Sequence, residues 1–203
     1  TTPANQCTRA AKRATLQTNL WGKALRGISV AAIFRAATKG LASAINKSSK
    51  YTETLNMFTV SMGAYAQQAF EYAQTVSEVM GINPADWMEN QGVFNSIITG
   101  FGVASDKAYT MSKNLTQLGY DISSFYDINV AEAMQKVQSG ISGELEPLRR
   151  LGYDLSVARL QQEAYNLGIQ KSVSDMTQAE KAQLRYHAML TQVTQVQGDM
   201  ART

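Results

Sequence analysis

The sequence predicts an all-α protein, and three observations carry this prediction. Apolar residues recur at alternating spacings of three and four along most of the chain, glycines follow these stretches, and helix-capping residues precede several of them. No segment alternates apolar and polar residues between hairpin turns. We therefore expect a basic, alanine-rich helical arm over residues 1–50, followed by a multi-helix bundle with glycine-terminated helices over residues 51–203.

The most regular pattern begins at Tyr51. Nine apolar or small residues share one helical face, namely Tyr51, Leu55, Phe58, Met62, Tyr65, Ala69, Tyr72, Val76 and Val79. The same spacing continues backwards, so a nearly continuous helix over residues 8–80 would be of order 100 Å long. We expect its breaks at Gly63 and at residues 47–50.

This face suits either an intermolecular coiled coil or packing beneath later helices. Its Tyr and Ala content favours the second arrangement, because coiled-coil seams prefer Leu, Ile and Val. We therefore expect Phe58, Met62, Tyr65 and Tyr72 to contact residues 104–118 and 179–200 of the same chain.

A six-residue motif predicts how helices end. Leu118–Ser123 reads Leu-Gly-Tyr-Asp-Ile-Ser, and Leu151–Ser156 reads Leu-Gly-Tyr-Asp-Leu-Ser. Glycine adopts the left-handed conformation after a helix at little cost, and the following Asp can cap the next helix. The predicted helix stops are Gly81, Gly119, Gly152 and Gly168. The residues between the two copies do not align, which argues against a helical repeat array.

Helix starts are marked by capping residues. Asn83 precedes Pro84, and both Asn129 and Thr177 have a glutamate three residues later. We expect short helices over 84–88 and 93–98, then helices over 104–118, 130–137, 147–151 and 155–167. The last helix should run from Thr177 to Met200.

Charge is distributed unevenly along the chain. Residues 1–50 contain nine Lys or Arg and no acid, whereas the other 153 residues contain ten basic and sixteen acidic groups. A cationic arm on a mildly acidic body predicts an anionic partner, such as nucleic acid, lipid headgroups or an acidic protein wall. The candidate contacts are Arg9, Lys12, Arg13, Lys23, Arg26, Arg35 and Lys39.

The sequence argues against several other classes of protein. It has no run of 18 uncharged apolar residues to suggest a membrane span, and its polar start does not resemble a signal peptide. The chain opens without Met and stops inside an apparent helix, so we expect a segment of a longer protein.

Catalytic and metal-binding residues are scarce. Cys7 and His187 are the only Cys and His, and Glu144 and Glu146 are two apart, so on a helix they would not face each other. We therefore predict no enzyme activity, no catalytic residues, no metal site and no cofactor.

Residues 51–203 resemble the helical domain of tape measure proteins from long-tailed (siphovirus-like) bacteriophages and prophages. Four phrases in the family's order carry the resemblance. They are Gly102–Ser112 with Leu115–Gly119, Ser124–Ile128, Gly140–Gly152, and Met176–Tyr186 with Gln197–Arg202.

The resemblance implies a structural virion protein that sets tail length during assembly and leaves ahead of the DNA during infection. It would be made in the bacterial host cytoplasm and lie in the tail lumen or at a tail end. The implied partners are other copies of itself, tail tube and tail tip proteins, and tail assembly chaperones. Host membrane contact during ejection and non-specific DNA contact are further expectations.

A membrane-active helical module, pore-forming or toxin-like, is the alternative. Ala32, Ala36, Gly40 and Ala44 form a small-residue face in the basic arm that permits close helix approach in water or in lipid. In this alternative the arm inserts into lipid.

Overall fold

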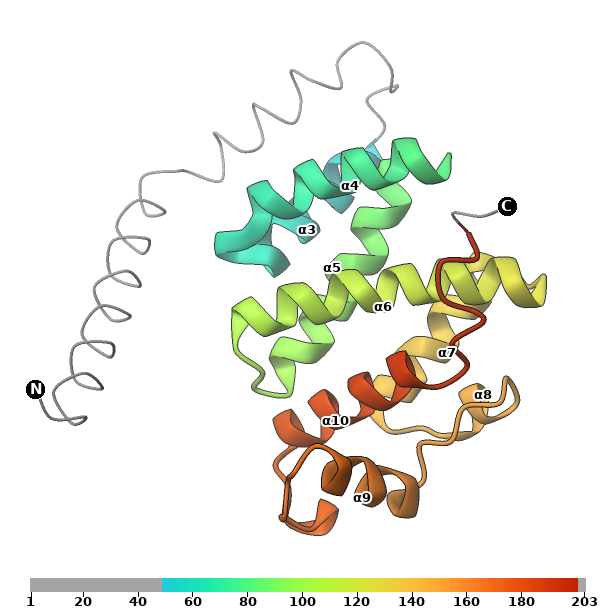
Figure 1. The fold of residues 1–203 in the computed structure, drawn as a ribbon. Coiled ribbons are helices and arrows are strands. Elements are labelled where there is room, and N and C mark those ends of the chain that lie inside the picture. The colour runs from blue at the N-terminus through green and yellow to red at the C-terminus, as the bar shows by residue number, and fades with distance from the viewer. Residues whose placement is uncertain (1–48, 201–203) are drawn as a thin grey trace, which may run out of the picture. The chain divides into compact units, whose positions relative to one another are not determined.

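The structure is a computed structural model, and it describes residues 49–200 (Figure 1). The chain divides between Lys47 and Ser48, and every described residue belongs to the second unit. Residues 1–48 of the basic arm, which include Cys7 and the small-residue face, therefore lie outside the described residues.

Residues 49–200 form helices and no strand, which confirms the predicted fold class for this part of the chain. In chain order the elements are α3 (Ser49–Met62), the 3₁₀ helix η1 (Gly63–Tyr65), α4 (Ala66–Met80), α5 (Pro84–Gly100), α6 (Ser105–Tyr126), α7 (Val130–Ser142), α8 (Glu146–Arg149), α9 (Val157–Asn166), the 3₁₀ helix η2 (Val173–Asp175) and α10 (Gln178–Thr191).

The helices pack mainly on their neighbours in the sequence. α5 lies between α3 and α6, α6 packs on α7, and α7 contacts both α8 and α10, while α9 packs on α10. The long helix α6 crosses the middle of the bundle in Figure 1, with α3 and α4 on one side and α9 and α10 on the other. α6 is thus the element that joins the two halves of the bundle.

The expected break at Gly63 is confirmed. Gly63 has φ +53°, and η1 separates α3 from α4 at this point. Phe58 and Met62 are buried, but α3 packs chiefly on α5 rather than on the helices we expected. The expectation holds in part for the tyrosines, since Tyr65 stacks on Tyr109 of α6 with ring centroids 5.3 Å apart. Val79, expected on the same face, is 73% exposed.

α5 corrects the prediction of two short helices. It runs without interruption through Gly92, where a Cβ would lie 2.9 Å from Met57 Sδ and 3.3 Å from Ser61 Oγ of α3. The glycine therefore allows α3 and α5 to approach closely and does not end a helix.

α6 corrects the prediction of a helix stop at Gly119. The helix continues to Tyr126 and ends at Asp127, which has φ +52°. Gly119 lies inside the helix and is buried against Met134 of α7. Asp121 consequently cannot cap a following helix.

The other three glycines adopt the predicted left-handed conformation. Gly81 (φ +66°), Gly152 (φ +88°) and Gly168 (φ +76°) follow α4, α8 and α9 respectively. The cap of α9 differs from the prediction, because Ser156 rather than Asp154 accepts a backbone hydrogen bond inside the helix, from Arg159 N at 3.3 Å.

All three predicted N-caps are confirmed. Asn83 accepts from Ala85 N at 2.9 Å and Asn129 from Glu132 N at 2.7 Å. Thr177 and Glu180 form a reciprocal capping box. At Asn129 only half of the box forms, since the Glu132 carboxylate lies 3.1 Å from Lys136 Nζ.

The last helix is shorter than predicted. α10 ends at Thr191, Gln192 is extended, and Val193 has φ +46°. Residues 192–200 then turn back onto α6, as Figure 1 shows in red. We refer to residues 192–200 as the strap.

Candidate functional site

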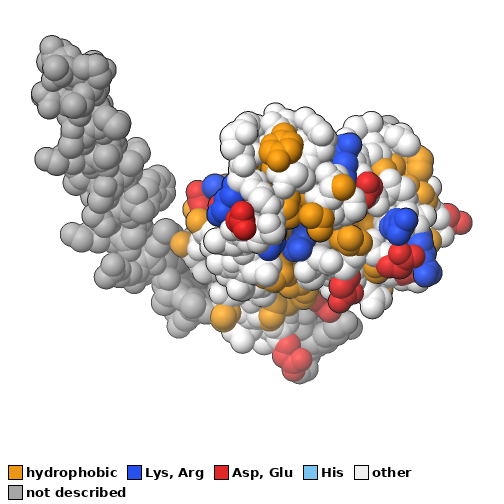
Figure 2. Space-filling model, turned by 90° about the horizontal axis from the view of Figure 1, so that it is seen from below, with side chains coloured by type: hydrophobic (Ala, Val, Ile, Leu, Met, Phe, Trp, Pro, Cys, Tyr) orange, Lys and Arg blue, Asp and Glu red, His pale blue; other side chains and the backbone are white. Residues whose placement is uncertain are grey.

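One candidate site is a groove of about 590 Å³ between α6, α10 and the segment that joins α9 to α10. Its apolar lining consists of Met111, Leu167, Ile169, Met176 and Leu184. Leu167 and Ile169 remain 46% and 39% exposed, so the groove opens to the surface. On the face in Figure 2, hydrophobic side chains are spread over the surface, several of them toward the middle, among acidic and basic side chains.

Hydrogen bonds tie the two helical walls of this groove together. Lys107 Nζ donates to Gln183 Oε1 at 3.0 Å, and Asn114 Nδ2 donates to Tyr186 Oη at 2.6 Å. The side-chain groups that form these two hydrogen bonds at the groove are therefore already paired within the bundle.

An ion pair lies at the N-terminal end of α10. Lys171 Nζ lies 2.8 Å from Glu180 Oε2, which also accepts from Thr177 N at 2.7 Å. The Lys171 ammonium and the Thr177 hydrogen bonds lower the pKa of Glu180 to about 2. Glu180 therefore serves the helix start, because its charge is already satisfied by local partners.

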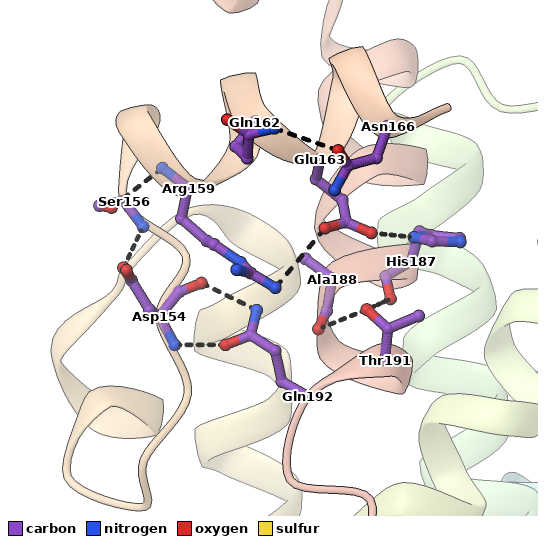
Figure 3. Close-up of polar contacts among 10 residues, drawn as sticks. All are labelled: Asp154, Ser156, Arg159, Gln162, Glu163, Asn166, His187, Ala188, Thr191 and Gln192. Carbon is purple, nitrogen blue, oxygen red and sulfur yellow. Dashed lines mark hydrogen bonds and ion pairs between the residues drawn. The ribbon is translucent and has the colours of Figure 1, made fainter. Parts of the chain in front are cut away.

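A buried carboxylate joins α9 to α10 (Figure 3). Glu163 is 5% exposed, and its Oε1 lies 2.9 Å from Nδ1 of His187. Its Oε2 lies 3.6 Å from Nη2 of Arg159. The Glu163–His187 contact links the two helices beside the groove.

Glu163 and Arg159 were not among the site residues predicted from the sequence. Their spacing of four along a helix was the available signal, since such pairs face each other. Their role as a bridge to His187 depends on the packing of α9 against α10, which the spacing does not reveal.

A second polar contact holds the end of α10 to the corner after α8. The side-chain amide of Gln192 pairs with the backbone of Asp154, accepting from its N at 2.8 Å and donating to its O at 2.9 Å (Figure 3). The Asp154 carboxylate accepts from Ser156 N at 2.9 Å, and this bond is the main reason that the pKa of Asp154 is lowered.

Asp121 is a deeply buried carboxylate, at 2% exposure. It accepts from Gly198 N at 2.8 Å, from Met200 N at 3.2 Å and from Gln117 Nε2 at 3.0 Å. It therefore anchors the strap on α6, a role that the predicted cap at this position did not include.

The structure distributes the predicted site residues over separate corners of the bundle. Gly81 and Asn83 belong to the α4–α5 corner, Asn129 to the α6–α7 corner, Gly152 to the end of α8, and Gly168 and Thr177 to the ends of the α9–α10 connection. They are structural positions and do not converge on one site. The candidate anionic-partner contacts Arg9, Lys12, Arg13, Lys23, Arg26, Arg35 and Lys39 lie outside the described residues.

The acidic side chains of the bundle are dispersed. Across residues 49–200 no three His, Cys, Asp or Glu side chains are grouped so that they could hold a metal ion. Glu144 and Glu146 have different partners, since Glu144 accepts from Ser139 Oγ at 3.1 Å and Glu146 pairs with Arg150 at 3.5 Å. These two carboxylates therefore do not form a pair.

Comparison of the chain with known protein families, with characterised proteins and with solved structures gave no match. No helix within residues 49–200 has both the length and the apolar character needed to cross a membrane.

Proposed function

We propose that this chain is a structural, non-catalytic part of a bacteriophage tail tape measure protein, acting in tail-length determination and released ahead of the DNA. The observation that carries the proposal is the order of the four resembling phrases along residues 102–202. Physics supports a ruler made of helices, because a helix converts residue number into distance at about 1.5 Å per residue.

The positions of these phrases in the bundle support a structural role. The first phrase supplies Gly119, which α7 approaches closely, and the third contains Gly140 and the Gly143 corner between α7 and α8. The second and fourth phrases meet where Ser124 Oγ donates to Asp199 Oδ2 at 2.8 Å. The resembling residues thus join helices to one another, as the residues of a scaffold would.

A tape measure protein requires a particular setting. The chain would lie in the tail lumen or at a tail end, with other copies of itself, tail tube and tail tip proteins, and assembly chaperones as partners. The nine cations of residues 1–50 would face an acidic tube wall, a host membrane during ejection, or DNA without sequence preference.

Tail length in the phage that encodes the chain tests the proposal. An in-frame deletion of residues 16–36 in the full-length protein should shorten the tail by roughly 30 Å, at about 1.5 Å per helical residue. The matched control exchanges Lys23 for Arg, and Arg26 and Arg35 for Lys, which preserves length and charge. Tails of unchanged length in the deletion variant, measured by electron microscopy, would contradict the proposal.

The small-residue face and the positive charge of residues 1–50 favour one other function, a membrane-active module. In that case the full chain would release dye from anionic vesicles, and the exchange of Ala36 and Gly40 for Leu would abolish the release by blocking close helix approach. Co-purification with tail tube or tail tip protein, without vesicle leakage, would favour the tape measure function.

A further inference from the structure

The strap, residues 192–200, is held by both copies of the Leu-Gly-Tyr-Asp motif. The copy inside α6 supplies Asp121, which accepts from Gly198 N and Met200 N. The copy after α8 supplies the backbone of Asp154, which pairs with Gln192. A Cβ on Gly152 of this second copy would lie 3.9 Å from Val193 Cγ2, so Val193 also lies beside the corner.

The first part of the strap has an unfavourable backbone conformation. Val193 has φ +46°, a region that a β-branched residue strongly resists because its Cβ crowds the backbone. Such a conformation persists only where the surrounding contacts impose it. The contacts to Asp154 and Asp121, one on each side of Val193, contribute to imposing it, together with the hydrogen bond from Ser124 Oγ to Asp199 Oδ2.

The sequence of the strap also suits a different conformation. Tyr186, Met189, Val193, Val196 and Met200 continue the three-and-four spacing of α10 without a break. In the bent state Val196 is fully buried, and Gly198 has φ +74°. A helix that continued to Met200 would relieve Val193 and lengthen α10 by about 14 Å.

We propose that the strap is a conformational switch with two states. In the bent state, which the structure shows, Asp121 and Asp154 hold residues 192–200 on the bundle. In the extended state the strap leaves Asp121, and α10 continues as one helix through Met200. The proposal that the strap has two states rests on the fold alone. The proposal that the strap uses them to convert a compact body into an extended helix within a tail rests on the proposed function.

A surface pocket beside the strap gives water access to its contacts. This pocket, of about 260 Å³, lies where the strap meets α6 and is lined in part by Asn114, Gln117, Asp121 and Gly198. The amide and carboxylate groups of this lining can hold water, so water can replace the strap around Asp121 after release. The buried carboxylate would then be solvated rather than left without partners.

Three substitutions should shift the strap between the bent and the extended state in directions that the proposal predicts. Asp121→Asn replaces one acceptor oxygen by an NH₂ group, which cannot accept the hydrogen bond from the strap backbone N–H at that position. This substitution should therefore favour the extended state. Gly198→Ala should do the same, because alanine resists φ +74° and favours helix. Val193→Gly should favour the bent state, because glycine accepts positive φ and weakens a helix.

The measurement is the set of carbon secondary chemical shifts of residues 192–200, recorded by NMR on the full chain. Asp121→Asn and Gly198→Ala should move these shifts toward helical values, and Val193→Gly should move them away. Asp127→Asn is the matched control, since it makes the same change at an exposed residue, at the end of the same helix and outside the strap contacts. It should leave residues 192–200 unchanged.

Amide protection of residues 182–188 in α10 shows whether each variant is folded. If Asp121→Asn and Gly198→Ala keep α10 protected but leave the strap at wild-type or random-coil shifts, the two-state proposal is wrong. This measurement is made on the isolated protein, so its failure leaves the tail-length proposal intact. Conversely, unchanged tails in the deletion experiment would not affect the switch.

Discussion

Gly119 of α6 lies directly against Met134 of α7. A Cβ built on Gly119 would overlap Met134 Sδ and lie 2.9 Å from Met134 Cε, and the Met134 side chain is itself 1% exposed. The absence of a side chain at position 119 therefore leaves room for the Met134 side chain against α6. This glycine acts through packing, whereas Gly152, in the same sequence motif, acts through backbone conformation.

Gly119→Ala should destabilise the bundle by about 1–3 kcal/mol, because the added methyl group overpacks a filled contact. Gly100→Ala is the matched control. Gly100 is also helical, but a Cβ added there would have no atom within 4 Å, so alanine should be neutral or stabilising. Urea unfolding at pH 7 measures both, and equal effects at the two positions would contradict the packing argument.

At Gly152 the conformation rather than space should decide the outcome. Gly152→Val should cost more than about 1 kcal/mol, because a β-branched residue resists φ +88°. Gly152→Asn should be tolerated better than valine, since Asn adopts positive φ more readily. Gly119 should show no such rescue by Asn, which is larger than Ala, and the order of free energies of unfolding at the two positions distinguishes the two roles.

Two neighbouring tyrosines should respond differently to loss of their hydroxyl groups. Tyr126 Oη donates to Leu151 O at 2.6 Å, so Tyr126→Phe should cost about 1 kcal/mol at pH 7. The Tyr153 hydroxyl is buried and has no hydrogen-bond partner within the described part of the chain. Tyr153→Phe should therefore be nearly neutral or stabilising at pH 7, and urea unfolding of the two variants measures the difference.

The Tyr153→Phe substitution should also change the alkaline stability. Burial raises the pKa of Tyr153, with smaller contributions from Tyr126 and Asp121. A raised pKa means that the folded state binds the hydroxyl proton of Tyr153 more tightly than the unfolded state does. The resulting contribution to the free energy of unfolding is fully present below about pH 10, the ordinary pKa of tyrosine, and is lost as the pH rises beyond it. Tyr153→Phe should move the midpoint of alkaline unfolding upward, and an unchanged midpoint would show that Tyr153 does not limit stability there.

The capping box of α10 should make stability fall in acid. The pKa of Glu180 is lowered from 4.5 to about 2 in the folded protein, so its contribution is present above pH 4.5 and is lost as the pH falls from there to 2. Glu180→Gln should reduce this loss, because glutamine keeps the capping geometry without the charge that Lys171 pairs with. Melting temperatures between pH 6 and 2 measure the slope, and Glu78→Gln, an exposed residue of α4, should retain the wild-type slope.

Helix starts could be predicted from the sequence because capping is local. The side chains of Asn83, Asn129 and Thr177 reach backbone N–H groups only two or three residues ahead, and this geometry depends little on the rest of the fold. The all-α class could be predicted for a similar reason, since the three-and-four spacing reports which side of each helix is buried.

Gly81, Gly152 and Gly168 adopt the left-handed conformation that the sequence predicted, but other helix ends and the groove depended on tertiary structure. The glycines at 92 and 119 interrupt the expected pattern, yet α5 and α6 continue through them because α3 and α7 pack where a side chain would be. The groove beside His187 and the Glu163 bridge combine residues from α6, α9 and α10, whose proximity no local pattern indicates.

The repeated Leu-Gly-Tyr-Asp motif shows what could be predicted from the sequence and what depended on tertiary structure. By itself the sequence determined that each copy places a glycine, with its wide choice of backbone conformation, between a leucine and a tyrosine: Leu118 and Tyr120 in one copy, Leu151 and Tyr153 in the other. Only tertiary structure decided that Gly119 is helical and Gly152 left-handed. Glycine adopts both conformations almost equally well, so the surrounding contacts decide between them. Met134 packs against Gly119 in the first copy, and the Gln192–Asp154 contact lies beside Gly152 in the second.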